Sequence, residues 1–199
     1  MSAKFGPAGN SDSFSKVHKS SLAAPGWIAD FGLDCYEYQC GRGVNIGEEK
    51  ARLLGEKAKE KGVYAIDAPV SGGDVGAQKG TLSIMVGGDK EAVDACMDVL
   101  KCMGTSIVYE GGAGAGQHTK MANQIAIAGA VAGVCEALAY AKAAGLDLQG
   151  VLDAISTGAA GSWQMSNNGV KMLQEDYNPG FFIKHFIKDM RLAKEAATA

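Results

Sequence analysis

The sequence has no cluster of basic residues. It is also slightly acidic overall, because 22 aspartates and glutamates outnumber 19 lysines and arginines and give a net charge of -3. Binding to a phosphate backbone relies on clustered lysine and arginine, so we expect no nucleic-acid partner. The five cysteines are odd in number and never stand in a C-x-x-C spacing. We therefore expect neither a disulfide framework nor a metal site, and a reducing compartment is favoured.

A long apolar run is also missing, although 47% of the 199 residues are hydrophobic. The longest, Ile125 to Cys135, falls short of the roughly 20 residues that cross a bilayer, so we expect a globular chain with no membrane partner. The serine- and lysine-rich start lacks the arginines and the amphipathic face of an organellar transit peptide. We expect residues 1–30 to be disordered, and the compartment is left open between cytoplasm and mitochondrion.

Strands and helices are expected to alternate along residues 31–111. One helix should begin after Asp89 as its N-cap, bury Val93, Met97 and Leu100 on one face, and stop at Gly104. Such alternation predicts an α/β layer on a mainly parallel sheet. The expected strands cover residues 33–40, 63–67, 81–88 and 106–110, and the expected helices cover residues 47–62 and 89–103.

A long helix is expected from Gln117 to Ala144, because this stretch has neither proline nor a turn cluster and carries alanines and glycines at helical spacing. Further helices are expected at residues 147–156, 163–174 and 184–198, with a break at "NPG". The sequence therefore predicts two domains, an α/β domain over residues 31–111 and an all-helical domain over residues 112–199.

Two glycine-rich stretches are candidates for phosphate binding. In "GGAGAGQHTKMANQ" (111–124), Gln117 follows the last glycine where a P-loop needs lysine, and the G-x-G-x-x-G spacing fails, so a phosphate loop is disfavoured. The stretch "GRGVNIG" (41–47) precedes an expected helix and has Asp67 some twenty residues further on, as in a dinucleotide fold. Its preceding strand is too polar for one buried on both faces, so a dinucleotide loop is disfavoured here as well.

Two groups of polar residues could form a site. On the long helix Lys120, Asn123 and Gln124 share one face, with Gln117 one turn earlier. They are either a functional cluster or a solvated stripe from which the lysine reaches water. After Pro69, the segment "SGG" is either a pocket for a carboxylate or an ordinary turn.

The segments "DAPVSGG" (67–73), "GGAGAGQHTKMANQ" and "NPGFFIKHFIKDMRLA" (178–193) follow one another as in the β-hydroxyacid dehydrogenase family. From about residue 60 onward the sequence resembles 3-hydroxyisobutyrate dehydrogenases, tartronate semialdehyde reductases and plant-type glyoxylate/succinic semialdehyde reductases. The resemblance implies the C-terminal part of a Rossmann-like parallel-sheet domain followed by an all-helical domain. It also implies NAD or NADP as cofactor, a short hydroxy acid or its semialdehyde as substrate, and a homo-oligomer formed through the helical domain.

The resemblance assigns roles residue by residue. Oxidising an alcohol by hydride loss requires removal of its hydroxyl proton, and a lysine whose pKa is lowered by desolvation can take or return that proton. The assigned residues are Ser71, Gly72 and Gly73 at the substrate carboxylate, Lys120 as general acid/base, Asn123 orienting substrate or lysine, and Lys188 near the nicotinamide end of the cofactor.

The sequence departs from its relatives in three places. The related 6-phosphogluconate dehydrogenases carry a His-Asn pair where this chain has Asn123 and Gln124, so decarboxylation of a phosphosugar is disfavoured. No G-x-G-x-x-G turn precedes residue 60, and the family's terminal helices are missing after "KDMRLA". We expect a chain truncated at both ends that binds the dinucleotide weakly. The alternative function is a catalytically inactive remnant that acts as a partial fold or oligomerisation module.

Overall fold

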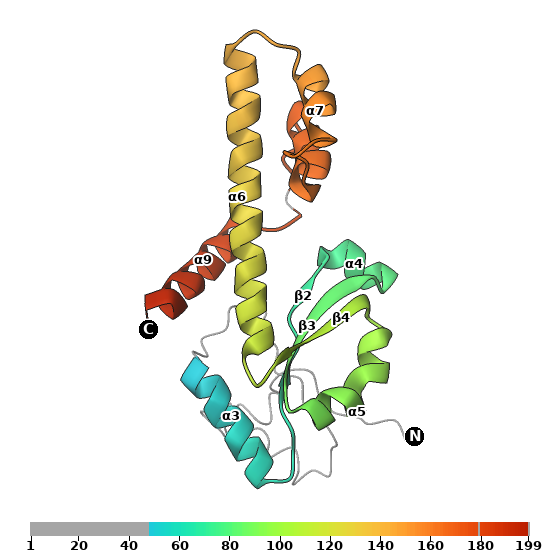
Figure 1. Ribbon diagram of the computed structural model, residues 1–199, viewed down its shortest axis with the longest axis vertical. Coiled ribbons are helices and arrows are strands. Elements are labelled where there is room, and N and C mark those ends of the chain that lie inside the picture. Colours follow the sequence, from blue (N-terminus) through green and yellow to red (C-terminus); the bar gives the residue numbers. More distant parts are fainter. Residues whose placement is uncertain (1–47, 179, 199) are drawn as a thin grey trace. The chain divides into compact units, whose positions relative to one another are not determined.

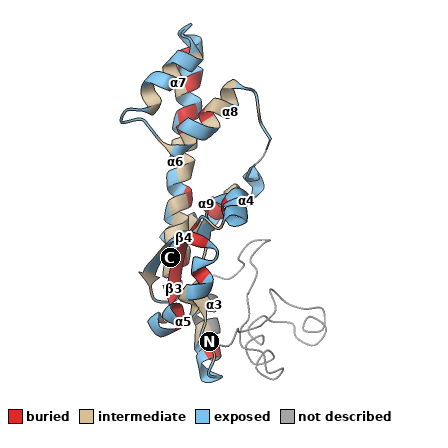
Figure 2. Cartoon of the chain, turned by 90° about the vertical axis from the view of Figure 1, so that its right-hand side faces the viewer, coloured by how far each residue is buried: buried red, intermediate tan, exposed pale blue. Residues whose placement is uncertain are grey.

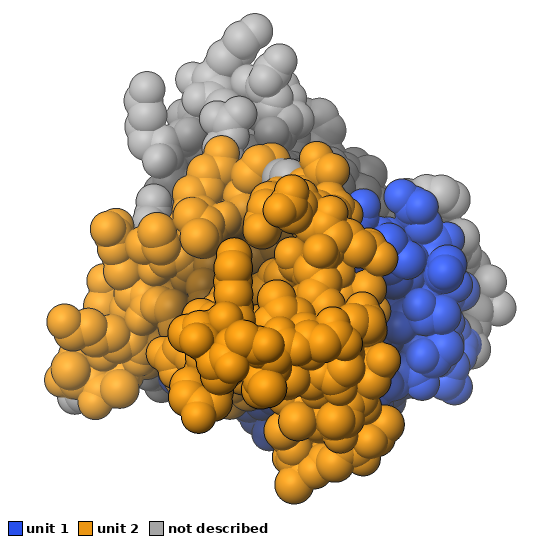
Figure 3. Space-filling view, turned by 90° about the horizontal axis from the view of Figure 1, so that it is seen from above, with its two compact units in different colours: residues 1–120 blue, residues 121–199 orange. Residues whose placement is uncertain are grey.

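The computed structural model describes residues 48–178 and 180–198, and the chain divides into two compact units, residues 1–120 and 121–199 (Figure 3). The domain boundary expected near residue 112 precedes the long helix, whereas the compact units divide inside that helix, after Lys120. The expectations for residues 1–30, for the strand at 33–40 and for "GRGVNIG" lie outside the described residues.

The first unit is built around a central strand, β3 (Figure 1). β3 pairs in parallel with β4 and antiparallel with β1 and β2. The described elements of this unit, in chain order, are α3 (Glu48–Glu60), β1 (Ile66–Asp67), β2 (Val70–Ser71), α4 (Gly73–Lys79), β3 (Leu82–Gly88), α5 (Lys90–Lys101) and β4 (Gly104–Gly111).

The fold class is α/β, as expected, but the expectation of a mainly parallel sheet is wrong for the described strands. A parallel crossover needs about a dozen residues or more. Residues 89–103, which contain α5, are long enough for one, and β3 and β4 are parallel. Residues 72–81 are too few, and β2 turns back antiparallel onto β3. The lengths of these two connections are thus consistent with a parallel β4 and an antiparallel β2.

β1 and β2 pair with β3 in one register, with Ile66 opposite Gly88 and Val70 opposite Ile84. Between them Pro69, which has no N–H to donate, interrupts the ladder. Its carbonyl still accepts a hydrogen bond of 3.0 Å from the N–H of Met85. The chain therefore follows β3 closely on both sides of the break, and Ser71 emerges at a defined position.

The core of the first unit lies between β3 and α5, which Figure 1 shows side by side. Val93 and Leu100 are buried and Met97 packs against them, so the predicted apolar face of α5 is confirmed. Each such side chain contributes about 1.5–3 kcal/mol when fully buried. The buried residues of this cluster are Leu82, Ile84 and Val86 from β3 and Val93 and Leu100 from α5.

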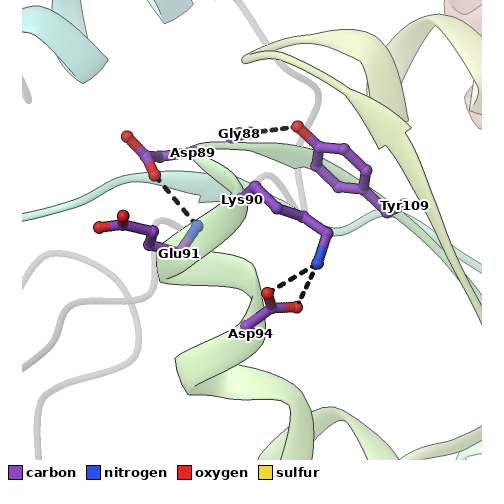
Figure 4. A network of polar contacts seen from close by, with 6 residues as sticks. All are labelled: Gly88, Asp89, Lys90, Glu91, Asp94 and Tyr109. Atoms are coloured by element: carbon purple, nitrogen blue, oxygen red, sulfur yellow. Dashed lines mark hydrogen bonds and ion pairs between the residues drawn. The ribbon is translucent and has the colours of Figure 1, made fainter.

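The start of α5 is held by a small polar network (Figure 4). Asp89 is the N-cap, as predicted, and its Oδ1 accepts the N–H of Glu91 at 3.1 Å. The hydroxyl of Tyr109 donates to the carbonyl of Gly88 at 3.2 Å, and Lys90 Nζ lies 2.6 Å from Asp94 Oδ1. These contacts fix the corner where β3 passes into α5.

The expectation that Gly104 ends α5 is wrong, because Gly104 is the first residue of β4. The helix ends at Lys101, with Cys102 as its C-cap. A Cβ on Gly104 would clash with the carbonyl of Leu82 and come within 2.9 Å of Ile84 Cγ1. Glycine is therefore needed here because β3 and β4 approach closely, and not because a helix stops.

The second unit is all-helical in its described residues, as predicted. Its core joins α6, α7 and the π-helical segment η2 through four buried residues, Val134, Leu138, Leu152 and Met165. In place of the single helix expected at residues 163–174, the structure has the π-helical segment η2 followed directly by the short helix α8. The elements are α6 (Ala115–Ala143), which begins in the first unit, α7 (Leu148–Ser156), η2 (Met165–Gly169), α8 (Val170–Leu173) and α9 (Ile183–Thr198).

α6 is long and apolar enough to cross a membrane, judged by length and composition alone, and it is the one such helix among the described residues. The sequence argument counted only the uninterrupted run from Ile125 to Cys135 and was too narrow, because alanines and glycines extend the apolar stretch. One such helix is weak support for a span, since core helices of soluble proteins pass the same test. Only 22% of its apolar window is buried within the chain, and Figure 2 colours much of α6 as exposed or intermediate.

Candidate functional site

The carboxylate of Asp67, at the end of β1, lies at the beginning of α6. Its Oδ1 accepts the N–H of Gly114 at 2.7 Å, and its Oδ2 accepts the N–H of Gln117 at 2.9 Å. The first N–H groups of a helix have no partner within the helix, and negative charge is favourable there. Asp67 thus serves as the cap of α6, a role that sequence reasoning missed because it considered this residue only for its spacing from "GRGVNIG", as in a dinucleotide fold.

The glycine run before α6 is shaped by this carboxylate. Gly111 and Gly114 have φ values of 132° and 91°, which favour glycine. A Cβ on Gly116 would clash with the carbonyl of Met85 and lie 2.8 Å from Asp67 Oδ2. The N–H groups of Gly114 and Gln117, which a bound phosphate would need, are already hydrogen-bonded to Asp67. The glycines therefore admit a side chain of the protein itself.

Lys120 lies in the second turn of α6 and is half-buried. Its Nζ donates a hydrogen bond of 2.8 Å to the carbonyl of Val70. Val70 directly precedes Ser71, so two groups that the sequence singled out separately, the lysine and the Ser-Gly-Gly segment, come together in the first unit. The alternative in which Lys120 reaches only solvent does not describe this arrangement.

The Ser-Gly-Gly segment leaves the sheet and turns sharply into α4. Gly72 and Gly73 adopt φ values of 130° and 62°, conformations that L side chains rarely adopt. A Cβ on Gly72 would come within 3.1 Å of Leu82 Cδ2. Ser71 is half-buried, whereas both glycines are exposed. The segment thus begins directly after the carbonyl that Lys120 contacts, with Ser71 followed by an exposed stretch of backbone.

The remaining assigned residues belong to a polar chain within the second unit. Asn123 Nδ2 donates to Gln124 Oε1 at 3.0 Å, and Gln124 Nε2 donates to Asp189 Oδ2 at 2.6 Å. The other oxygen of Asp189 pairs with Lys188 Nζ at 2.9 Å. Gln124 and Asp189 are buried, with exposed fractions of 3% and 5%. Sequence reasoning assigned roles to Asn123 and Lys188 and placed Gln124 on the helix face of Asn123, but it did not foresee that Gln124 and Asp189 form a buried pair that joins α6 to α9.

Metal chemistry finds no support in the described part of the chain, where no three His, Cys, Asp or Glu side chains are grouped so as to hold an ion. His185 lies against two aromatic rings, with ring centroids 6.0 Å from Phe181 and 6.2 Å from Phe182. Within the first unit, Lys120 and the Ser-Gly-Gly segment supply an ammonium group and a hydroxyl. Groups of these kinds suit proton transfer and the binding of a small polar substrate.

Sequence models of two protein families match the chain. The model described as the NAD binding domain of 6-phosphogluconate dehydrogenase matches residues 42–111. The model described as NAD-binding of NADP-dependent 3-hydroxyisobutyrate dehydrogenase matches residues 114–199. Together they cover both described units.

Individual proteins agree with these families. An uncharacterized oxidoreductase of Bacillus subtilis (strain 168), YkwC, is 60% identical over 147 residues, which are 74% of this chain and 51% of that protein. The 2-hydroxy-3-oxopropionate reductase of Escherichia coli (strain K12) is 39% identical over 155 residues, 78% of this chain and 53% of that protein. The chain therefore spans about half the length of these relatives.

A solved structure is similar as well. The 3-hydroxyisobutyrate dehydrogenase of Mycobacterium tuberculosis, solved with L-serine, aligns with a TM-score of 0.69 at 33% identity. The alignment covers 76% of this chain and 55% of that one. The α/β unit followed by helices is thus the arrangement of a known dehydrogenase fold.

Proposed function

The chain belongs to the β-hydroxyacid dehydrogenase family. From this premise we propose that it forms part of an oxidoreductase that interconverts a short β-hydroxy acid and its semialdehyde with NAD or NADP. The observation that carries the proposal is the placement of Lys120, whose Nζ lies 2.8 Å from the carbonyl of Val70, immediately before Ser71. An acid/base group and a segment suited to a carboxylate are thereby neighbours in one unit.

Lys120 is the proposed general acid/base. Oxidation of the alcohol requires a group that takes the hydroxyl proton, and reduction of the semialdehyde requires a group that returns it to the alkoxide. The carbonyl of Val70 holds the ammonium in one direction, which limits the positions that Nζ can reach. A proton carrier held in this way is prepared for one substrate orientation.

Ser71, Gly72 and Gly73 are the proposed binding segment for the substrate carboxylate. The serine hydroxyl can donate a hydrogen bond, and the two glycines leave the backbone open to a small anion. Asn123 is proposed to orient the substrate or the lysine. Its side-chain NH₂ group donates to Gln124, which leaves its carbonyl oxygen as an acceptor.

The cofactor, when bound, supplies or accepts the hydride. The glycine run before α6 is not proposed to hold its phosphates, because the N–H groups of Gly114 and Gln117 are bonded to Asp67. Lys188 is the proposed residue at the nicotinamide end. Its side chain is 36% exposed, and the ion pair with the buried Asp189 restrains its ammonium.

The helical unit is proposed to form a homo-oligomer. Large apolar side chains are exposed on α6, where Ile125 and Tyr140 have exposed fractions of 54% and 75%, and on α9, where Ile183 has 76%. Exposed apolar surface of this kind favours association. The similarities to oxidoreductases lend no support to the alternative of an inactive remnant.

Turnover tests the proposal. Because the chain spans half of its relatives, we would assay it as it stands and also joined behind the N-terminal segment of the Bacillus subtilis relative, following reduced nicotinamide with short β-hydroxy acids and their semialdehydes. Lys120→Ala should lower kcat by about 10²–10⁴-fold with a smaller change in KM, since the proton is transferred in the transition state. Lys142→Ala, on the exposed end of the same helix, is the control. No turnover in either form, or an unchanged kcat for Lys120→Ala, contradicts the proposal.

A further inference from the structure

We propose that Asp67 is a positioning residue that sets the location of Lys120 relative to the Ser-Gly-Gly segment. The inference rests on the proposed role of Lys120 and extends it to a residue that does not touch the substrate. Three observations support it: the close packing of Gly87 and Gly116 around the Asp67 carboxylate, the hydrogen bonds from α6 to that carboxylate, and the contact between Lys120 and Val70.

The carboxylate occupies a space that is available only because the residues on two sides of it are glycines. Asp67 is opposite Gly87 in the pairing of β1 with β3, and a Cβ on Gly87 would lie 2.6 Å from Asp67 Oδ1. On the other side, a Cβ on Gly116 would lie 2.8 Å from Asp67 Oδ2. Real Cβ atoms essentially never come so close. The sheet and the helix start therefore approach the carboxylate from two sides, and both glycines are needed for it to fit.

The bonds of this carboxylate fix the first turn of α6. Asp67 Oδ2 accepts from the N–H of Gln117, which precedes Lys120 by three residues and so by less than one helical turn of 3.6 residues. A shift of Gln117 is therefore transmitted to Lys120 with little loss.

The strand side is short and rigid as well. Asp67 precedes Val70 by three residues, and Pro69, whose ring restricts φ, lies between them. Two short segments, 67–70 and 117–120, are thus tied at both ends, by Gln117 to Asp67 at 2.9 Å and by Lys120 to Val70 at 2.8 Å. The distance between the lysine and Ser71 depends on both ties.

Three substitutions separate the tie from its surroundings. Asp67→Asn keeps the shape but replaces one acceptor with an NH₂ group, which then faces the N–H of Gly114 or of Gln117. Gly116→Ala crowds the carboxylate, and also the backbone carbonyl of Met85, without changing a polar group. Gly112→Ala is the matched control in the same loop, because its Cβ would meet nothing within 4 Å and its φ is ordinary.

The first measurement needs no turnover. A small acylating reagent is applied to the folded chain, and the modification rates of Lys120 and the exposed Lys142 are compared by mass spectrometry. Lys120 should react more slowly than Lys142. In Asp67→Asn and Gly116→Ala its rate should rise toward that of Lys142, and in Gly112→Ala it should stay slow. An unchanged rate in both of the first two variants, with folding verified by circular dichroism, overturns the inference.

The second measurement uses the active form. Asp67→Asn and Gly116→Ala should lower kcat by up to about 100-fold with a small change in KM, as a misplaced catalytic group does. In a Lys120→Ala background Asp67→Asn should lower kcat little further, because the group that it positions is gone. An equal loss in both backgrounds overturns the inference. If the enzyme shows no turnover with hydroxy acids, the proposed function fails, whereas the modification rates still decide the role of Asp67.

Discussion

The carboxylate of Asp189 accepts a hydrogen bond of 2.6 Å from the side-chain amide of Gln124, although 65 residues separate the two along the chain. Both side chains are buried, and the second oxygen of Asp189 pairs with Lys188. A buried carboxylate needs such partners, since an unpaired one would be costly. The pair therefore joins α6 to α9 and holds Asn123 and Lys188 at its two ends.

Replacing this carboxylate should weaken the helical unit. Asp189→Asn places an NH₂ group against the amide of Gln124 or the ammonium of Lys188, and a buried donor without an acceptor costs about 1–3 kcal/mol. Denaturant unfolding measures the loss. The control is Asp153→Asn, because Asp153 accepts a similar bond of 2.8 Å from Gln149 on the exposed face of α7. The control should change the free energy of unfolding by less than about 0.5 kcal/mol, and an equal loss in both variants would contradict the prediction.

The close approach of β3 and β4 should make Gly104 intolerant of any side chain. Gly104→Ala introduces a methyl group against the carbonyl of Leu82 and within 2.9 Å of Ile84 Cγ1. Overpacking of this kind costs about 1–3 kcal/mol, which thermal unfolding would record as a lower Tm. Gly55→Ala, in α3, meets nothing within 4 Å and should leave the Tm unchanged or raise it.

The exposed small residues of α6 allow a test of the proposed oligomer. Gly129→Ala meets nothing within 4 Å inside the chain, and alanine favours a helix interior by about 0.8–1 kcal/mol over glycine. If a second copy packs closely against this face, the variant should associate more weakly while its helices become more stable. Analytical ultracentrifugation and circular dichroism measure the two effects. Self-association of unaltered strength would place the interface away from Gly129.

The pKa of Asp176 should be lower in the folded chain than its ordinary value of 3.8, first because the backbone N–H of Asn178 hydrogen-bonds to the carboxylate and second because the Asn178 side chain does so. A depressed folded pKa adds stability above pH 3.8 that is lost as the pH falls through the folded value. The residue is exposed, so the contribution is small. In an NMR titration, Asn178→Ala should raise this pKa only part of the way, because the backbone bond remains. A full return to 3.8 would assign the shift to the side chain.

Sequence patterns predicted those parts of the fold that depend on local spacing. The apolar face of α5, its cap at Asp89 and the long α6 follow from helical periodicity and capping chemistry. Strand direction could not be predicted in this way, because β1 and β2 are two residues each and carry no directional signal. Gly104 was misassigned because a glycine suits both a helix end and a crowded strand, and only the neighbouring strand distinguishes the two.

The residues of the candidate site likewise fall into those that local motifs predict and those that depend on distant partners. Lys120 and Ser71 stand in recognisable motifs, and the structure adds that Lys120 is bonded to the residue before Ser71. Asp67 and Asp189 act through partners 50 and 65 residues away, namely Gln117 and Gln124. Nothing in the local sequence marks such partners, although an acidic residue at the end of a very short strand is a signal that could have drawn attention to Asp67.

The close packing of Gly87 and Gly116 around the Asp67 carboxylate has an evolutionary consequence. Gly87 and Gly116 are both crowded by this carboxylate, and each is also crowded by a backbone carbonyl, that of Gly112 or of Met85. A lineage that replaces the aspartate therefore releases only part of the constraint on both glycines, whereas a change at either glycine first would displace the carboxylate. Substitutions at these three positions should therefore be correlated across related sequences, with the aspartate changing before either glycine.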